Sequence, residues 1–160
     1  MTSDELDEID LGILHMLQQN ARNMTLGDME SSLPVSDATV GNRIASMEEK
    51  GIIEGYVPII NYEAAGFPLW VVFECTAPID KRADIAMEAL ESEGVVHVQE
   101  MIAATGNVRV TMVAKETTEI ASTAHQLVEL GLTIENEVLS QREYIQPFGH
   151  FGAEALDSQR

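Results

Sequence analysis

The side chains with the clearest chemical potential lie close together between residues 36 and 43. The amide of Asn42 can donate and accept hydrogen bonds at once, which is the pattern needed to hold the edge of an adenine. The guanidinium of Arg43 can hold the edge of a guanine or clamp a phosphate group. Thr39 offers a hydroxyl to a phosphate and a methyl group to a thymine. These residues are candidates for DNA contacts, provided that one element of structure presents them together.

Two short helices are predicted before this segment. Apolar residues recur at three- and four-residue steps from Leu6 to Leu17, which predicts an amphipathic helix over about residues 6–20. Thr25 is a favourable N-cap, and Asp28 three residues later completes a capping-box pattern. The second helix begins there and ends at Pro34, since proline disfavours helix in the residue before it.

A third predicted helix would present the candidate residues. Ser36 is its N-cap, Gly51 closes it, and its inner face is formed by Val40, Ile44 and Met47. The short connection to the second helix makes the pair a helix-turn-helix candidate. A recognition helix enters the major groove with its N-terminal half. The predicted DNA-contacting residues are Ser36, Asp37, Ala38, Thr39, Asn42 and Arg43.

Simpler roles remain open for several residues of this region. Ser36 can act only as a helix cap, and Asn42 can simply be solvated. Arg22 can approach the DNA backbone or form a structural salt bridge. Asp37 repels phosphate unless it accepts a hydrogen bond from a cytosine amino group, and Gly41 costs about 1 kcal/mol relative to alanine inside a helix.

From Leu69 onward the apolar pattern changes to that of strands alternating with helices. Strands are predicted over residues 69–77, 95–103, 108–113 and 133–145, and helices over residues 82–92 and 118–130. The order βαββαβ is the ferredoxin-like motif. The predicted fold class is therefore α+β, with an N-terminal winged-helix-type helix-turn-helix followed by a ferredoxin-like domain. The expected boundaries are residues 1–60 for the first domain, 61–68 for a linker, 69–148 for the second domain and 149–160 for a C-terminal tail.

Composition limits the alternatives. The chain has 27 acidic and nine basic residues and a net charge of −18, distributed over both halves, so a basic DNA-binding surface is missing. No apolar run is long enough to span a bilayer, and the acidic N-terminus is unlike a signal peptide, so a cytoplasmic protein is expected. Cys75 lies in an apolar run and is expected to be a buried, inert thiol. The four histidines are far apart, and neither a metal site nor a cofactor is expected.

Several motifs at fixed spacing together resemble one family. They are Leu-Asp-Glu-Ile-Asp at residues 6–10, Leu-Gln-Gln-Asn-Ala-Arg at 17–22, the set Ser36, Thr39, Val40, Arg43 and Ile44, Glu-Glu-Lys-Gly-Ile-Ile at 48–53 with Gly55-Tyr56, and Gly66. Over roughly residues 6–146 the chain resembles the Lrp/AsnC (feast/famine) transcription regulators of bacteria and archaea. The resemblance implies sequence-specific binding to double-stranded DNA, and it favours DNA contact for Asn42 and Arg43.

The resemblance also implies a sensing function for the second domain. Family members form homodimers that assemble further, often to octamers, and bind amino acids or related metabolites between sensing domains. Their effectors bind around the turn after the second strand, which assigns effector binding here to Thr105, Gly106, Asn107 and Arg109. The family commonly places an acidic residue after the glycine, whereas this chain has Asn107. Arg109 would favour an anionic ligand, or it can pair with Glu100 or Glu137 across the sheet.

Two other functions are weighed against a regulator. The first is a sensor of ligands or partner proteins that lacks DNA binding, which the low content of basic residues supports. The second is an enzyme similar to the siroheme decarboxylases, with His97 as the candidate residue. No nucleophile–base pair and no phosphate-binding loop is visible, so no enzymatic activity is expected. The excess of acid resembles the surfaces of halophilic archaeal proteins, and it predicts that folding and DNA binding both need concentrated salt.

Overall fold

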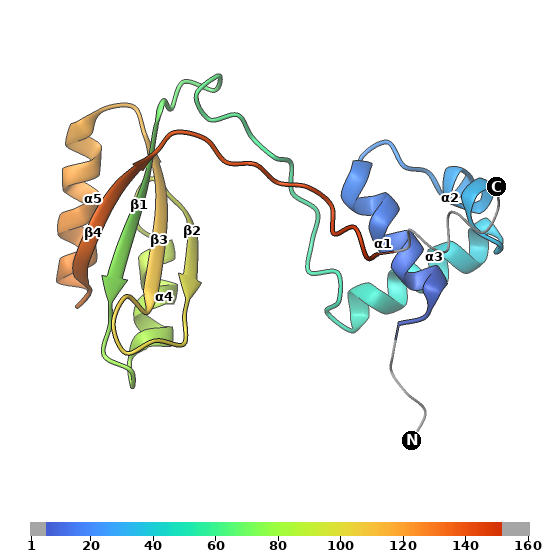
Figure 1. Ribbon diagram of the computed structural model, residues 1–160, viewed down its shortest axis with the longest axis horizontal. Coiled ribbons are helices and arrows are strands. Elements are labelled where there is room, and N and C mark those ends of the chain that lie inside the picture. Colours follow the sequence, from blue (N-terminus) through green and yellow to red (C-terminus); the bar gives the residue numbers. More distant parts are fainter. Residues whose placement is uncertain (1–5, 152–160) are drawn as a thin grey trace. The chain divides into compact units, whose positions relative to one another are not determined.

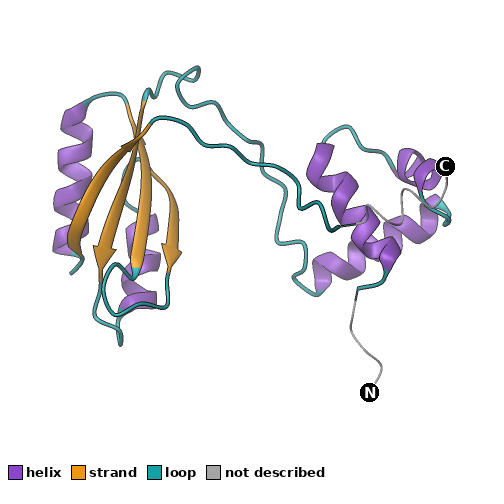
Figure 2. Ribbon diagram, viewed as in Figure 1, coloured by secondary structure: helices purple, strands orange, loops and turns teal. Residues whose placement is uncertain are grey.

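The computed structural model describes residues 6–151, which form two compact units (Figures 1 and 2). The first unit contains residues 6–58 together with residues 144–151, and the second contains residues 59–143. Every helix within these described residues is too short or too polar to cross a membrane.

The first unit contains three helices, which are α1 (Glu8–Asn20), α2 (Leu26–Ser32) and α3 (Asp37–Glu49). Thr25 and Asp28 form the predicted capping box at the start of α2, and Ser36 caps α3 as predicted. The first helix begins two residues later than predicted, because Asp7 has an extended backbone and caps the helix with its side chain. All three helix starts are therefore fixed by short polar side chains that satisfy free backbone amides.

An aliphatic core holds the three helices together. Its buried members are Ile13, Leu14, Met16, Met29, Leu33, Val40 and Met47. The predicted inner face of α3 is confirmed, since Val40 and Met47 are almost fully buried and Ile44 packs beside them. After α3 the chain forms no strand between residues 51 and 68, and the side chains of Val57 and Ile59 are exposed.

The second unit is a four-stranded antiparallel sheet covered by two helices. Its elements are β1 (Leu69–Thr76), α4 (Arg82–Leu90), β2 (Val95–Glu100), β3 (Val108–Ala114), α5 (Thr117–Glu129) and β4 (Thr133–Ser140). The strand order is β2-β3-β1-β4. This is the ferredoxin-like βαββαβ arrangement, so the predicted α+β fold is confirmed.

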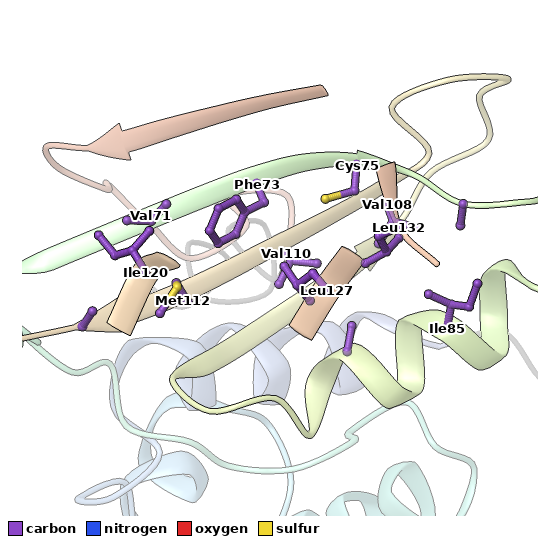
Figure 3. Close-up of a cluster of buried hydrophobic side chains, with 13 residues drawn as sticks. Val71, Phe73, Cys75, Ile85, Val108, Val110, Met112, Ile120, Leu127 and Leu132 are labelled. Atoms are coloured by element: carbon purple, nitrogen blue, oxygen red, sulfur yellow. The ribbon is translucent and has the colours of Figure 1, made fainter. Parts of the chain in front are cut away.

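One face of the sheet carries the core of this unit (Figure 3). Register places Val71 opposite Met112 and Phe73 opposite Val110, so that these side chains share one face. Residues from both α4 and α5 belong to the same buried cluster, which means that both helices cover this face. Cys75 also lies in the cluster, where burial and the negative charge of Glu135 raise the pKa of its thiol to about 11. The prediction of a buried, inert thiol is confirmed.

Two predicted strands are too long. β2 was expected to continue to residue 103 but ends at Glu100, whose partner Val108 is the first residue of β3. β4 was expected to reach residue 145 but ends at Ser140, which lies opposite Trp70 at the start of β1. Each strand ends where its partner strand begins, because an extended segment without a partner has no ladder of hydrogen bonds to join.

Candidate nucleic-acid interface and effector site

The α2–α3 pair forms a tight helix-turn-helix, and its second helix presents one face outward. Ala38, Asn42 and Ala45 are exposed, while Val40 and Met47 are buried on the opposite side. The side-chain amide of Asn42 is therefore accessible on this outer face. Gly41 lies beside α2, and a β-carbon built on it would be 3.4 Å from Leu26 Cδ1. The outer face of α3 therefore carries small and amide side chains, and its opposite face packs against the helical core.

The polar groups at the start of α3 are occupied by the helix itself. Ser36 Oγ accepts a hydrogen bond from the Thr39 amide at 3.4 Å and lies 3.0 Å from Thr39 Oγ1. The Asp37 carboxylate accepts from the Ala38 amide at 2.6 Å. Ser36 is therefore the N-cap of α3, which is the simpler of the two roles expected from the sequence. The hydroxyls of Ser36 and Thr39 remain at the exposed entry of the helix, where a helix N-terminus favours anions.

Arg43 is turned toward α1 and bridges two carboxylates there. Its Nη1 lies 2.7 Å from both oxygens of Asp7 and 2.8 Å from Asp10 Oδ1. The Arg43 side chain is 28% exposed, and the Asp10 side chain is only 16% exposed. Both partners occupy the capping box of α1, so Arg43 ties the recognition helix to the first turn of α1. Sequence reasoning predicted a DNA contact for Arg43 and did not identify Asp7 and Asp10 as its partners.

The protonation states of this cluster follow from its contacts. Burial alone would raise the pKa of the Asp7 carboxyl, but hydrogen bonds from Arg43 and from the amides of Asp10 and Ile9 bring that pKa below its usual value. Hydrogen bonds to Asp7 and Asp10 raise the pKa of Arg43. Asp7 and Arg43 therefore form an ion pair at neutral pH, because the contact stabilises the charged form of each.

Most polar groups of the predicted effector turn are already paired within the chain. Asn107 is fully buried, and its side chain accepts from the Ala77 amide at 2.8 Å and donates to the Ala77 carbonyl at 2.9 Å. Gly106 has a φ of 59°, in the left-handed region that favours glycine, and its amide donates to Thr76 Oγ1 at 2.8 Å. Thr105 is exposed at the tip of this turn.

The charged groups near the turn form ion pairs that the sequence did not specify. Arg109 lies directly opposite Glu74 in the sheet, with Nη2 3.3 Å from Glu74 Oε1. The alternative that Arg109 pairs with a glutamate is confirmed, but the two suggested partners are wrong. Glu137 lies on β4, which β1 separates from β3. Glu100 is paired with Arg82 at 3.0 Å. Arg109 Nε is buried without a partner among the described residues.

Comparisons with known proteins agree with both halves of this description. Residues 6–54 match the winged helix-turn-helix DNA-binding family. The transcriptional regulator LrpA of Pyrococcus horikoshii is 33% identical over 88 residues, which are 55% of this chain and 62% of that protein. The regulator Ptr1 of Methanocaldococcus jannaschii is 44% identical over 62 residues, 39% of this chain and 41% of that protein.

Solved structures extend the likeness to the whole fold. The leucine response regulatory protein LrpA of Mycobacterium tuberculosis has a TM-score of 0.75 at 20% identity, covering 91% of this chain and 99% of that one. An AsnC family transcriptional regulator from Agrobacterium tumefaciens has a TM-score of 0.67 at 18% identity, covering 88% and 93%. Residues 6–54 are thus a winged helix-turn-helix DNA-binding domain, and most of the chain is similar to transcription regulators of the Lrp/AsnC type.

His97, the candidate residue for enzymatic chemistry, lies in a strand and has no catalytic partner beside it in register. His97 is exposed on β2 opposite Thr111. On that face of the sheet the nearest residues in register are Gln99 and Arg109, and Arg109 is paired with Glu74. Within residues 6–151 no group of three or more histidine, cysteine, aspartate or glutamate side chains could hold a metal ion. The relatives that match the chain are transcription regulators.

Proposed function

We propose that this regulator binds operator DNA through the outer face of α3, with Asn42 as its main base-reading residue. The observation that supports the proposal is the exposure of Asn42 on a capped helix whose opposite side is buried. Small neighbours at Ala38 and Ala45 let this face approach the base edges closely. Ser36 and Thr39 would contact phosphate at the helix entry, and Asp37 would accept from a cytosine amino group.

Within this proposal Arg43 orients the recognition helix. Its Nη1 contacts both oxygens of Asp7 and one of Asp10, so leaving them for a base would expose two uncompensated carboxylates. Arg22, exposed after α1, remains to contact the DNA backbone. With so few cations, affinity depends on base contacts and on pairing two recognition helices in a homodimer. Such a protein would act in the cytoplasm, where its DNA is, and its dimers could assemble further, to octamers.

We also propose that a small molecule of the amino-acid type controls DNA binding. A structurally similar regulator, NMB0573 of Neisseria meningitidis, was solved as a complex with L-Met; it has a TM-score of 0.71 at 18% identity, covering 90% of this chain and 96% of that one. In this chain the predicted effector residues Thr105, Gly106 and Asn107 form the turn before β3, and Arg109 lies in β3. Asn107 and the Gly106 amide are paired within the chain, so they shape the turn. The Thr105 hydroxyl would meet the ligand, together with the part of the Arg109 guanidinium that Glu74 does not occupy.

Selection of binding sites from random DNA, followed by affinity measurements over a salt series, tests the proposal. Asn42→Ala should reduce the preference for selected over random DNA by about 5- to 150-fold, the value of one bidentate base contact. Asn23→Ala makes the same chemical change away from α3 and should leave that preference unchanged. A folded chain that selects no sequence at any salt concentration would refute the DNA claim and favour a sensor that lacks DNA binding.

A further inference from the structure

The last described residues of the chain belong to the helical unit rather than to the sheet. β4 ends at Ser140, and residues 144–151 cluster with α1, α2 and α3. Figure 1 shows this red segment reaching α1. The amide of Phe148 donates a hydrogen bond to Gln18 Oε1 at 3.0 Å, which joins positions 130 residues apart.

This segment brings aromatic side chains to a core that has none of its own. The three helices contain no phenylalanine, tyrosine or tryptophan, and Tyr56 is the first aromatic residue of these types in the chain. Phe151 packs against the buried aliphatic cluster of the helices. Phe148 lies edge-on to Phe151, with ring centroids 4.8 Å apart at 82°. Phe148 is itself 52% exposed, so the arm adds one large side chain to this small core and packs a second ring against it.

We propose that Tyr144–Phe151 form a C-terminal arm that completes the DNA-binding unit. The arm binds to Gln18 and to the aliphatic core of the three helices. Only the description of these helices as a DNA-binding unit rests on the proposed function. Because the arm follows β4 after only three residues, Gln141–Glu143, it also gives the edge strand of the sensing sheet a direct covalent connection to α1. The segment at residues 51–68 is then one of two connections between sheet and helices.

Hydrogen exchange measured on the full-length chain tests the arm in the absence of DNA. Replacing both rings, Phe148→Ala with Phe151→Ala, should accelerate amide exchange in α1 and α3 by about tenfold or more, because the helices lose part of their core. Exchange in β1 and β3 should not change. Ile145→Ala is the matched control, since this apolar residue of the arm is 64% exposed. Gln18→Ala keeps both rings and should accelerate exchange only around positions 18 and 148.

The outcomes separate this proposal from the one before it. Unchanged exchange in α1 and α3 would overturn the arm, as would equal acceleration in the control variant or in the sheet. If the double variant is too unstable to measure while Ile145→Ala is not, the Gln18→Ala result decides: local acceleration at both positions supports the arm, and its absence overturns it. Failure of the wild-type chain to select DNA would contradict the proposed function and leave the exchange result standing.

Discussion

The cluster of Arg43 with Asp7 and Asp10 allows a sharp test of what holds the recognition helix. Replacing Arg43 by methionine keeps much of its apolar stem and removes the charge. It leaves Asp10, 16% exposed, beside Asp7 without a cation. Hydrogen bonds to charged groups contribute about 1.5–3 kcal/mol, whereas exposed ion pairs contribute about 0.2–1 kcal/mol. Asp7 is 52% exposed, whereas Asp10 is only 16% exposed. We therefore expect a loss of about 2 kcal/mol in the free energy of unfolding of the helical unit.

The matched partner substitution is Asp7→Asn. Asparagine is as good an N-cap as aspartate, so this change removes the negative charge and retains the cap of α1. A double-mutant cycle of Arg43→Met with Asp7→Asn should give a coupling energy of about 0.5–1.5 kcal/mol. Hydrogen exchange in α1 and α3 measures the helical unit, while fluorescence of Trp70, the single tryptophan, monitors the sheet unit separately.

The same cluster has a defined pH dependence. The folded-state pKa of Asp7 lies below the usual value of an aspartate, so the cluster contributes its full stability above that usual pKa and loses it as pH falls through the lowered pKa. Arg43→Met should remove this part of the acid sensitivity. A coupling energy near zero would refute the positioning role. So would an Arg43→Lys variant of unchanged stability that shifts base preference, because that result is expected of a direct base contact.

Three further predictions follow from the described structure. Asn107→Ala leaves the buried amide and carbonyl of Ala77 without partners and should cost about 2–5 kcal/mol in denaturant unfolding followed by Trp70 fluorescence, whereas the exposed Thr105→Ala should cost less than about 0.5 kcal/mol. Gly41→Ala should stabilise α3 by up to about 1 kcal/mol in thermal unfolding, because the half-exposed Leu26 side chain can give way; destabilisation would show that α2 cannot move. The chain has a net charge of −18, so its midpoint of thermal unfolding should rise between about 0.1 M and about 1 M KCl, as the Debye length falls to about 3 Å. Equal stability in dilute buffer would contradict the high-salt hypothesis.

Local features of the candidate site could be read directly from the chain. The caps at Thr25 and Ser36 and the buried side of α3 depend on residues three or four positions apart, and all were predicted. The excess of acid near the helices pointed away from DNA, yet it did not reveal that two of those acids hold Arg43. A signal existed, since Asp7 and Asp10 stand at N-cap and N3 spacing. Only the packing of α3 against α1 shows which cation they face.

The sensing unit shows the same division between local pattern and long-range contact. The order of its strands and helices could be predicted from local pattern, because the change of period and the turn at Gly106 are local. The ends of β2 and β4 were decided by where β3 and β1 begin, which no pattern within the strand can specify. Asn107 was predicted to contact the ligand. Its side chain instead makes hydrogen bonds to the backbone of Ala77, 30 residues away, and no local pattern specifies that partner.

The recognition helix itself was therefore fixed by sequence: its start at the Ser36 cap, its buried stripe and the outward position of Asn42 follow from spacing along one helix. Tertiary structure decided what its side chains are free to do. Arg43 is held by carboxylates 33 and 36 residues away, and the helices receive aromatic cover from the far end of the chain. Caps and amphipathic faces arise from neighbours within a turn or two, whereas ion-pair partners and core completion depend on which distant segments the fold brings together.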